Sequence, residues 1–354
     1  MRRIGINALY LKPGEVGGTE IYLRGLLAGF AEIDKGGNQY IVFGNAETEA
    51  FTAPASNFIW ERLPVRSSFR AGRILYEQSV LPWAARHVDV MLNPGFTAPL
   101  AGFANVTVFH DLQHVRHPEY FRWFDLPAWR LLLRASAMRS KRLIAVSEAT
   151  RVDLQKYYGL ESTVVPHGVD ARFYTIGEAR ALEPSLLYVS TLHPHKNHVR
   201  LLRAFAAFHG RRPEFLLVLA GVRGFATPQV EAEIARLNLQ KAVRVTGWIS
   251  QESMYELYRT AAAAVYPSTF EGFGMPVLEA FASQVPLACS AIEPLTSLAA
   301  GHAVLFDPED VDDLAGALER VIDNPPDTKL ALEYSRRFTW AEAARRTLDV
   351  LLSV

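Results

Sequence analysis

The stretch 266–279 combines residue types that suit recognition of an anionic ligand rich in hydroxyl groups. Glu271 and Glu279 lie eight positions apart, and two glycines and a proline separate them. The apolar run 261–266 predicts a buried strand before the loop. Pro276 favours the first turn of a helix, because proline has no amide that needs a partner there. The glycines let the backbone approach a ligand closely, and the amino end of the helix attracts an anion.

A sugar nucleotide matches this layout, with amides for the diphosphate and one carboxylate each for the hydroxyls of the hexose and the ribose. The alternative is an ordinary strand–turn–helix connection with solvated glutamates. The string 266–280 resembles the signature of the family-4 retaining glycosyltransferases, enzymes of the GT-B fold. The resemblance covers nearly the whole chain and is firmest over 185–318. It implies that Glu271 meets the hexose and Glu279 the ribose, and that the loop residues between them line the donor site: Gly272, Phe273, Gly274 and Met275.

A second candidate segment, 190–198, contains a lysine and three histidines and reads Ser-Thr-Leu-His-Pro-His-Lys-Asn-His. Lys196 stands just before a predicted helix, where a point charge can meet a diphosphate leaving group. Members of the family usually carry an arginine where this chain has Thr191, so the second phosphate cation is unassigned, and Arg223 is the candidate for it. The three histidines could instead bind a metal, but their spacing gives no shared helix face and no cysteine joins them.

Two segments of the N-terminal half also match the family. Gly17 and Gly18 follow the first predicted strand within 14–20 and open a helix, and the resemblance implies that they lie under the donor diphosphate. They do not form the dinucleotide-binding fingerprint, because the Gly-x-Gly-x-x-Gly spacing is absent. The phrase Phe-His-Asp-Leu ends another apolar strand, and the resemblance implies that His110 faces the donor sugar near its anomeric carbon. Asp111 either orients this histidine or caps the next turn.

The acidic pair Asp310 and Asp312 imitates the Asp-x-Asp that holds a divalent metal in another class of glycosyltransferases. It stands at the start of a predicted helix, where acidic residues complement the helix dipole. We therefore predict that the pair is a helix cap, and that the enzyme has no metal site and needs no cofactor beyond its donor substrate.

Composition narrows the function further. Lysine and arginine equal aspartate and glutamate at 37 each, so no net field favours nucleic acid as a partner. The single cysteine, Cys289, excludes an internal disulfide and suits a reducing compartment. We expect a cytoplasmic protein. Leucines, tryptophans and arginines interleave over 120–142, and this pattern fits either a helix on the inner face of the membrane or a partly buried helix with a solvated basic face, which we prefer.

Strands and helices alternate throughout the chain, and this order predicts parallel, doubly wound sheets of the α/β class. Two such halves indicate an N-terminal Rossmann-like domain over 1–169, on the acceptor side, and a nucleotide-sugar-binding one over 170–338. By resemblance the two domains face each other across a cleft, and the helix 339–354 returns to the first domain. In such sheets ligands bind outside the carboxyl ends of the strands.

The resemblance implies transfer of a hexose from a nucleotide diphosphate to a hydroxyl of a glycan or lipid-linked glycan, with the anomeric configuration retained. The Thr-Leu-x-Pro-x-Lys-Asn variant at 191–197 is most like mannosyltransferases of bacterial surface-polysaccharide assembly, which points to GDP-mannose over a UDP-sugar. Two alternatives stay open: a sugar-nucleotide epimerase of the same fold, which would lack the paired-glutamate loop, and a catalytically idle subunit that binds the sugar nucleotide.

Overall fold

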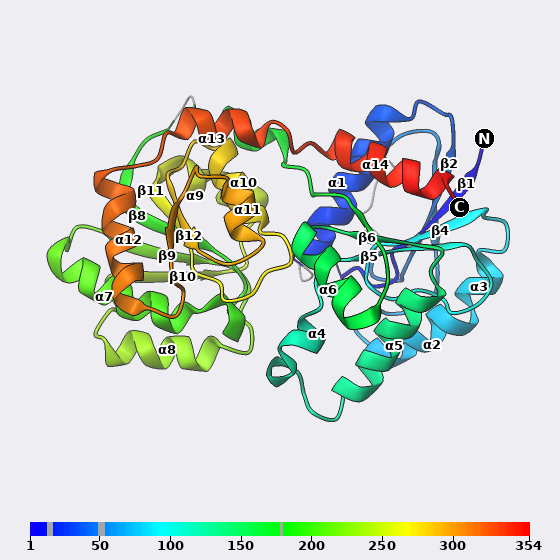
Figure 1. Ribbon diagram of the computed structural model, residues 1–354, viewed down its shortest axis with the longest axis horizontal. Helices are drawn as coiled ribbons and strands as arrows, with labels where there is room; N and C mark the ends of the chain where they lie inside the picture. The colour runs from blue at the N-terminus through cyan, green and yellow to red at the C-terminus, as the bar shows by residue number, and fades with distance from the viewer. Residues whose placement is uncertain (13–16, 49–53, 178–179) are drawn as a thin grey trace. The chain divides into compact units, whose positions relative to one another are not determined.

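The computed structural model describes residues 1–12, 17–48, 54–177 and 180–354 (Figure 1). The chain forms two compact units. Unit 1 consists of Met1–Gly168 together with Phe338–Val354, and unit 2 is the continuous segment Val169–Arg337. Within the described ranges, no helix has both the length and the apolarity needed to cross a bilayer. Positions 14–16 of the predicted glycine loop lie outside the described residues.

Unit 1 is built on a parallel sheet that has seven strands among the described residues, in the order β3-β2-β1-β4-β5-β6-β7. Its strands are short and mostly buried, as the β-branched and apolar runs predict. They are β1 Arg3–Asn7, β2 Gln39–Gly44, β3 Phe58–Arg62, β4 Val90–Asn93, β5 Asn105–Phe109, β6 Arg142–Ala145 and β7 Thr163–Val164.

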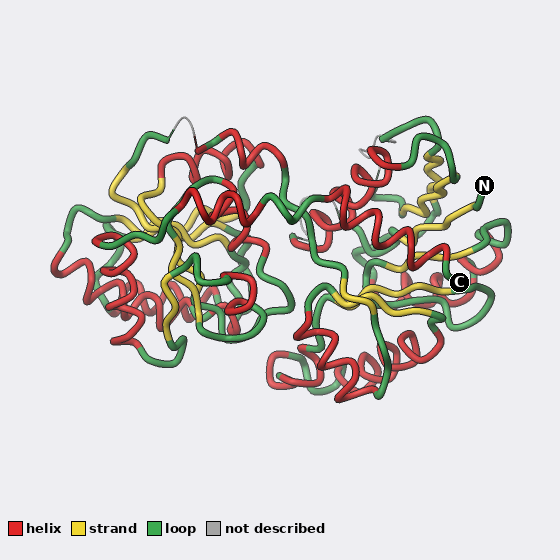
Figure 2. The backbone as a smooth tube through the Cα atoms, turned by 45° about the horizontal axis from the view of Figure 1, so that its top comes forward, coloured by secondary structure: helices red, strands yellow, loops and turns green. Residues whose placement is uncertain are grey.

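Helices cover both faces of this sheet (Figure 2). They are α1 Gly18–Ile33, α2 Arg70–Ser79, α3 Leu81–Ala84, α4 Gln113–Arg116, α5 Leu126–Arg139, α6 Glu148–Tyr158 and α14 Trp340–Leu352, with the 3-10 turn η1 Pro118–Tyr120. Ser147 caps α6, since its hydroxyl accepts a hydrogen bond from the amide of Thr150 at 3.1 Å. Helix α14 packs along α1. Glycines make this contact possible, because a Cβ added to Gly25 would lie 2.1 Å from the Trp340 ring.

Unit 2 repeats the plan with a parallel sheet of six strands among the described residues, in the order β10-β9-β8-β11-β12-β13. The strands are β8 Glu183–Val189, β9 Leu216–Ala220, β10 Val243–Gly247, β11 Ala261–Tyr266, β12 Leu287–Ser290 and β13 Val304–Phe306. The helices are α7 His198–Arg211, α8 Thr227–Arg236, α9 Gln251–Thr260, α10 Met275–Ala282, α11 Leu295–Ala299, α12 Val311–Asp323 and α13 Thr328–Ser335, with the turns η2 Ala171–Thr175 and η4 Pro194–Lys196.

Both units are therefore doubly wound Rossmann-like folds, and the predicted α/β class is confirmed. The strand order of unit 2 reverses between β8 and β11, and that of unit 1 between β1 and β4. Ligands of open parallel sheets bind at such reversals, outside the carboxyl ends of the strands. In unit 2 these ends lead into the loops that contain Lys196 and Glu271.

Candidate active site

The two loops at the strand-order reversal of unit 2 are tied directly to each other. The amide of Thr269, in the loop after β11, donates to the carbonyl of His195, in the loop after β8, at 2.8 Å. Asn197 adds a second link, since its side-chain amide donates to the carbonyls of Pro267 at 3.0 Å and Pro308 at 2.7 Å. This buried asparagine holds a left-handed backbone conformation, with φ at 59°, at the start of α7. The loops after β8, β11 and β13 are thus held as one assembly.

Lys196 and Glu271 meet within this assembly. The Nζ atom of Lys196 lies 2.6 Å from Oε1 of Glu271, and the two side chains are 16% and 9% exposed. The same ammonium lies 3.4 Å from the hydroxyl of Tyr266, at the end of β11. An ion pair this well shielded from water interacts far more strongly than one on the surface. The site therefore presents a cation and a carboxylate side by side on a rigid support.

Gly274 and Pro276 set the direction of helix α10. Gly274 precedes the helix with φ at 104°, a conformation that favours glycine, and an added Cβ would lie 2.5 Å from the Leu295 side chain. Pro276 occupies the first turn, as the sequence predicts. Of the neighbouring loop residues, Phe273 is buried, while Gly272 and Met275 are half-buried.

Glu279 follows in the second turn of α10. Its Oε2 atom accepts a hydrogen bond of 2.9 Å from the hydroxyl of Tyr258 on α9. The side chain is half-buried. Withdrawal of its carboxyl group from water raises the pKa of Glu279 to about 7; the bond from Tyr258 opposes this rise, and the charge of Asp170 reinforces it. The carboxyl group of Glu279 therefore changes its charge near neutral pH, and a hydrogen bond from a ligand hydroxyl to it would change in strength.

The histidines of 193–198 contact one another and neighbouring residues. The Nδ1 atoms of His193 and His195 lie 2.6 Å apart, and His198 bonds the hydroxyl of Ser190 at 3.1 Å through Nε2. Burial, reinforced by the charge of Lys196, lowers the pKa of His198 to about 3. The described residues contain no group of three or more histidine, cysteine, aspartate or glutamate side chains arranged to hold a metal ion.

The two remaining donor-site candidates in this unit lie at its surface. Thr191 is exposed. Arg223 forms an ion pair of 2.6 Å with Glu231 of α8, and the two side chains are 63% and 50% exposed. The acidic pair serves as a cap, since Oδ1 of Asp310 accepts hydrogen bonds from the amides of Asp312 and Asp313 at the start of α12.

In unit 1, His110 follows β5 and is buried. Its ring packs edge-on against Tyr22 at 4.9 Å between centroids, and its Nε2 donates to the carbonyl of Pro94 at 2.8 Å. Burial lowers the pKa of His110 to about 4, with the bond to Pro94 opposing the shift. The imidazole is therefore neutral at physiological pH. Asp111 accepts a hydrogen bond of 2.8 Å from the amide of Gln113, so its side chain holds the turn that leads into α4.

The glycines of unit 1 lie at the amino end of α1. Gly17 has φ at 56° and precedes the helix, and Gly18 is its first residue. Among the described residues, a Cβ added to either glycine would meet no heavy atom within 4 Å. The amino end of a helix of this length can receive an anion.

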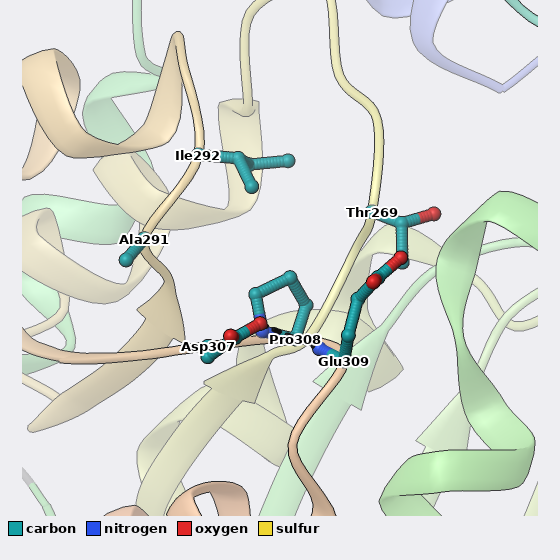
Figure 3. A pocket seen from close by; sticks show the side chains of 6 residues that line it. All are labelled: Thr269, Ala291, Ile292, Asp307, Pro308 and Glu309. Atoms are coloured by element: carbon teal, nitrogen blue, oxygen red, sulfur yellow. Dashed lines mark hydrogen bonds between the residues drawn. The ribbon is translucent and has the colours of Figure 1, made fainter.

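An open hollow of about 370 Å³ borders the Glu271 loop (Figure 3). Its lining includes Thr269 of that loop and Asp307 and Glu309, which follow β13. Ala291, Ile292 and Pro308 complete the lining. The hollow thus places a hydroxyl and two carboxylates at the carboxyl ends of β11 to β13, next to the loop that holds Glu271.

Three residues that the structure brings into the site were missed in the sequence. Tyr266 contacts Lys196, Tyr258 contacts Glu279, and Asn197 ties the loops together. The position of Tyr266 at the end of an apolar strand, just before the motif, could have singled it out. Tyr258 lies on a different helix from its partner, so sequence spacing carries no signal for that contact.

Comparisons with known proteins identify the family of the chain. Residues 177–345 match the family described as Glycosyl transferases group 1, and residues 16–173 match Glycosyltransferase Family 4. The O-antigen chain mannosyltransferase B of Escherichia coli is 25% identical over 287 residues, which cover 75% of each chain. The MMP alpha-(1->4)-mannosyltransferase of Mycolicibacterium hassiacum is 28% identical over 263 residues, which cover 69% of this chain and 64% of the relative, just under two thirds of its length.

Among solved structures, HepE of Anabaena in complex with UDP and glucose superimposes with a TM-score of 0.77 at 18% identity, over 100% of both chains. A likeness at this identity supports the fold. Together, the two family matches cover nearly the whole chain, and both Rossmann-like units have the expected sheets. The chain therefore belongs to the family-4 glycosyltransferases of the GT-B fold.

Proposed function

We propose that this glycosyltransferase moves mannose from GDP-mannose to a hydroxyl of a glycan or lipid-linked glycan, with retention of the anomeric configuration. The relatives named as mannosyltransferases support the choice of sugar. The Thr-Leu-x-Pro-x-Lys-Asn variant at 191–197 supports it as well. The proposal places the reaction in the cytoplasm, where the single, buried Cys289 would stay reduced.

The contact between Lys196 and Glu271 carries the proposal. A nucleotide sugar has a negative diphosphate joined directly to a neutral hexose, so its binding site needs a cation and a hydroxyl acceptor next to each other. The 2.6 Å pair provides both. When the donor binds, Lys196 turns its charge to the diphosphate and Glu271 accepts hydrogen bonds from hexose hydroxyls. The scissile bond then lies beside the two groups.

The reaction follows from this arrangement. The bond between the anomeric carbon and the phosphate oxygen breaks, and Lys196 stabilises the negative charge that develops on the departing diphosphate. The acceptor oxygen bonds to the anomeric carbon on the same face, and its proton passes to the departing phosphate oxygen. His110, a neutral ring with its Nε2 proton committed to Pro94, would contact the hexose and position it.

The donor is tested by incubating the full-length protein with labelled GDP-, UDP- and dTDP-sugars and following slow hydrolysis. Faster release of mannose and GDP from GDP-mannose than of products from the other donors is expected. A change of sugar configuration within an intact nucleotide would establish an epimerase instead. Tight donor binding without turnover under any acceptor would establish an idle binding subunit.

Metal independence is part of the same proposal. Within unit 2, Lys196 and the start of α10 are the groups we propose for the diphosphate charge. Asp310 is occupied as a helix cap. Transfer should therefore continue in excess EDTA. Loss of transfer with EDTA, and its recovery with Mn²⁺ or Mg²⁺, would show that a metal shares the diphosphate.

A further inference from the structure

Helix α5 buries one apolar stripe and leaves other large apolar residues exposed. Its buried stripe consists of Leu133, Ser136 and Ala137. At 100° per residue, Leu131 and Met138 point almost directly away from that stripe. They are 72% and 61% exposed. The preceding turn adds Trp123 and Phe124, which are 83% and 57% exposed. The water-facing crest of this segment therefore carries large apolar side chains beside the exposed Arg130, Arg134 and Arg139.

Helix α2 extends this crest into a surface. The Arg70 guanidinium lies 3.9 Å from the centre of the Trp129 ring on α5. At the other end of α2, the side-chain amide of Gln78 donates to the carbonyl of Ala98, and the backbone amide of Ala98 donates to the Ser136 hydroxyl of α5 at 3.1 Å. The two helices thus lie side by side in unit 1 (Figure 1). Phe69, which precedes α2, is 68% exposed, and Leu75, on α2, is 69% exposed.

Basic residues flank the same crest. The segment 122–142 has one acidic residue, Asp125, and six basic ones: Arg122, Arg130, Arg134, Arg139, Lys141 and Arg142. Its formal charge is therefore +5, from six minus one, whereas the whole chain has a formal charge of zero. This segregation of charge, together with exposed tryptophan, phenylalanine and leucine, separates the α2–α5 surface from ordinary solvated protein surface.

We propose that the α2–α5 surface, made of the exposed apolar residues of 69–75 and 123–138 and the basic residues of 122–142, docks on an anionic phospholipid bilayer. Apolar tips would enter the boundary between headgroups and acyl chains, while arginines would meet the phosphates around them. The inference goes beyond the transfer reaction and does not depend on which donor is used.

The test is flotation of the full-length protein with vesicles, without donor or acceptor. Binding is expected to vesicles of phosphatidylglycerol and phosphatidylcholine, to weaken in 0.5 M salt, and to be at least about tenfold weaker with phosphatidylcholine alone. Arg134→Gln with Arg139→Gln should weaken binding at least about tenfold, since each basic group near such a surface contributes about a fivefold factor. Trp123→Ser with Leu131→Gln should have a similar effect.

Matched controls are available in unit 2. Leu182→Gln with Leu330→Gln changes leucines that are 66% and 57% exposed. Arg211→Gln with Arg320→Gln changes two exposed arginines of α7 and α12. Both pairs should leave vesicle binding unchanged. Equal loss in these controls, or no binding of the unaltered protein to anionic vesicles, would overturn the proposal. The proposal would also be overturned if the protein bound no vesicles but self-associated in sedimentation experiments, and if the α2–α5 variants abolished that self-association.

Donor hydrolysis separates this proposal from the proposed function. The α2–α5 variants should hydrolyse a water-soluble nucleotide sugar at the normal rate, because none of their residues lies in the candidate active site. If no nucleotide sugar is turned over and the variants still lose vesicle binding, the docking surface stands and the proposed function fails. If turnover is normal and vesicles are never bound, the proposed function stands and the docking surface fails.

Discussion

Glu279 has a pKa of about 7, so its charge should control nucleotide affinity across neutral pH. The carboxyl is neutral below this value and charged above it, and a charged acceptor binds hydroxyls more strongly, by about 1.5–3 kcal/mol against about 1 for a neutral one. Affinity for GDP should therefore rise by up to about tenfold between pH 6 and pH 8. Isothermal titration calorimetry measures this directly.

Glu279→Gln is the control, because it keeps an acceptor for Tyr258 and cannot ionise. Its pH profile reports the titration of the nucleotide alone, and the difference between the profiles belongs to Glu279. Glu279→Ala should lower affinity by about 10- to 100-fold. Identical profiles for the unaltered protein and Glu279→Gln would mean that the ionisation of Glu279 does not influence the nucleotide.

Glu271 and His110 should matter to transfer more than to nucleotide binding. We expect Glu271→Ala and His110→Ala each to lower the transfer rate by at least about 100-fold, as loss of one preorganised polar contact does. Free GDP lacks the hexose, so its affinity should change by less than about threefold. Lys196→Ala should lower both quantities. Parallel loss of nucleotide binding in all three variants would assign these residues to support of the fold.

Part of this site could be predicted from the sequence, because loop residues such as Lys196 and Glu271 belong to motifs of fixed spacing. Their mutual contact could not, since they lie 75 positions apart and meet only through the pairing of β8 with β11. The same holds for Tyr258 and Glu279. Arg223 is the opposite case. It is the sequence-based candidate for the second phosphate cation because Thr191 replaces the usual arginine, but it lies at the surface in an ion pair with Glu231.

At the level of elements, Asn197 should control the stability of the loop assembly. Asn197→Ala leaves the buried carbonyls of Pro267 and Pro308 without their partner and puts alanine in a left-handed conformation, so the free energy of unfolding should fall by about 2–5 kcal/mol. Asn197→Gly loses the same hydrogen bonds and avoids the conformational cost. In urea unfolding, the stability of Asn197→Gly should therefore lie between that of Asn197→Ala and that of the unaltered protein. Equal losses of stability in the two variants would show that the left-handed backbone conformation does not contribute.

The sequence predicts most strands and the larger helices of both units, because apolar runs and caps such as Ser147 are local signals. It misses α2, and the reason is physical. The buried residues of α2 are Arg73 and Glu77, an ion pair of 3.3 Å that resembles an exposed helix face in the sequence. It also misses α13, whose buried residues are the small Ala331 and Ser335 and form no apolar stripe.

For the whole molecule, the α1–α14 contact should determine the stability of unit 1. Gly25→Val would force a side chain into the Trp340 ring and lower the stability of that unit by about 1–3 kcal/mol or more. Hydrogen exchange followed by mass spectrometry should show faster exchange in α1 than in the unaltered protein, with α7 of unit 2 unchanged. Adding Trp340→Ala should partly restore protection in α1. Equal acceleration in α1 and α7 would show that the effect is not confined to the α1–α14 contact.

The return of α14 to unit 1 also orders events during synthesis. Unit 2 is continuous, so it can fold as soon as Arg337 has left the ribosome, whereas unit 1 lacks the helix that covers Gly25 and Gly29 until residues 338–354 emerge. At about 5–20 residues per second, the ribosome needs roughly 10–40 s to make the intervening chain. During that interval the nascent N-terminal unit exposes its α1 groove, and chaperones that recognise apolar surface would find their substrate there.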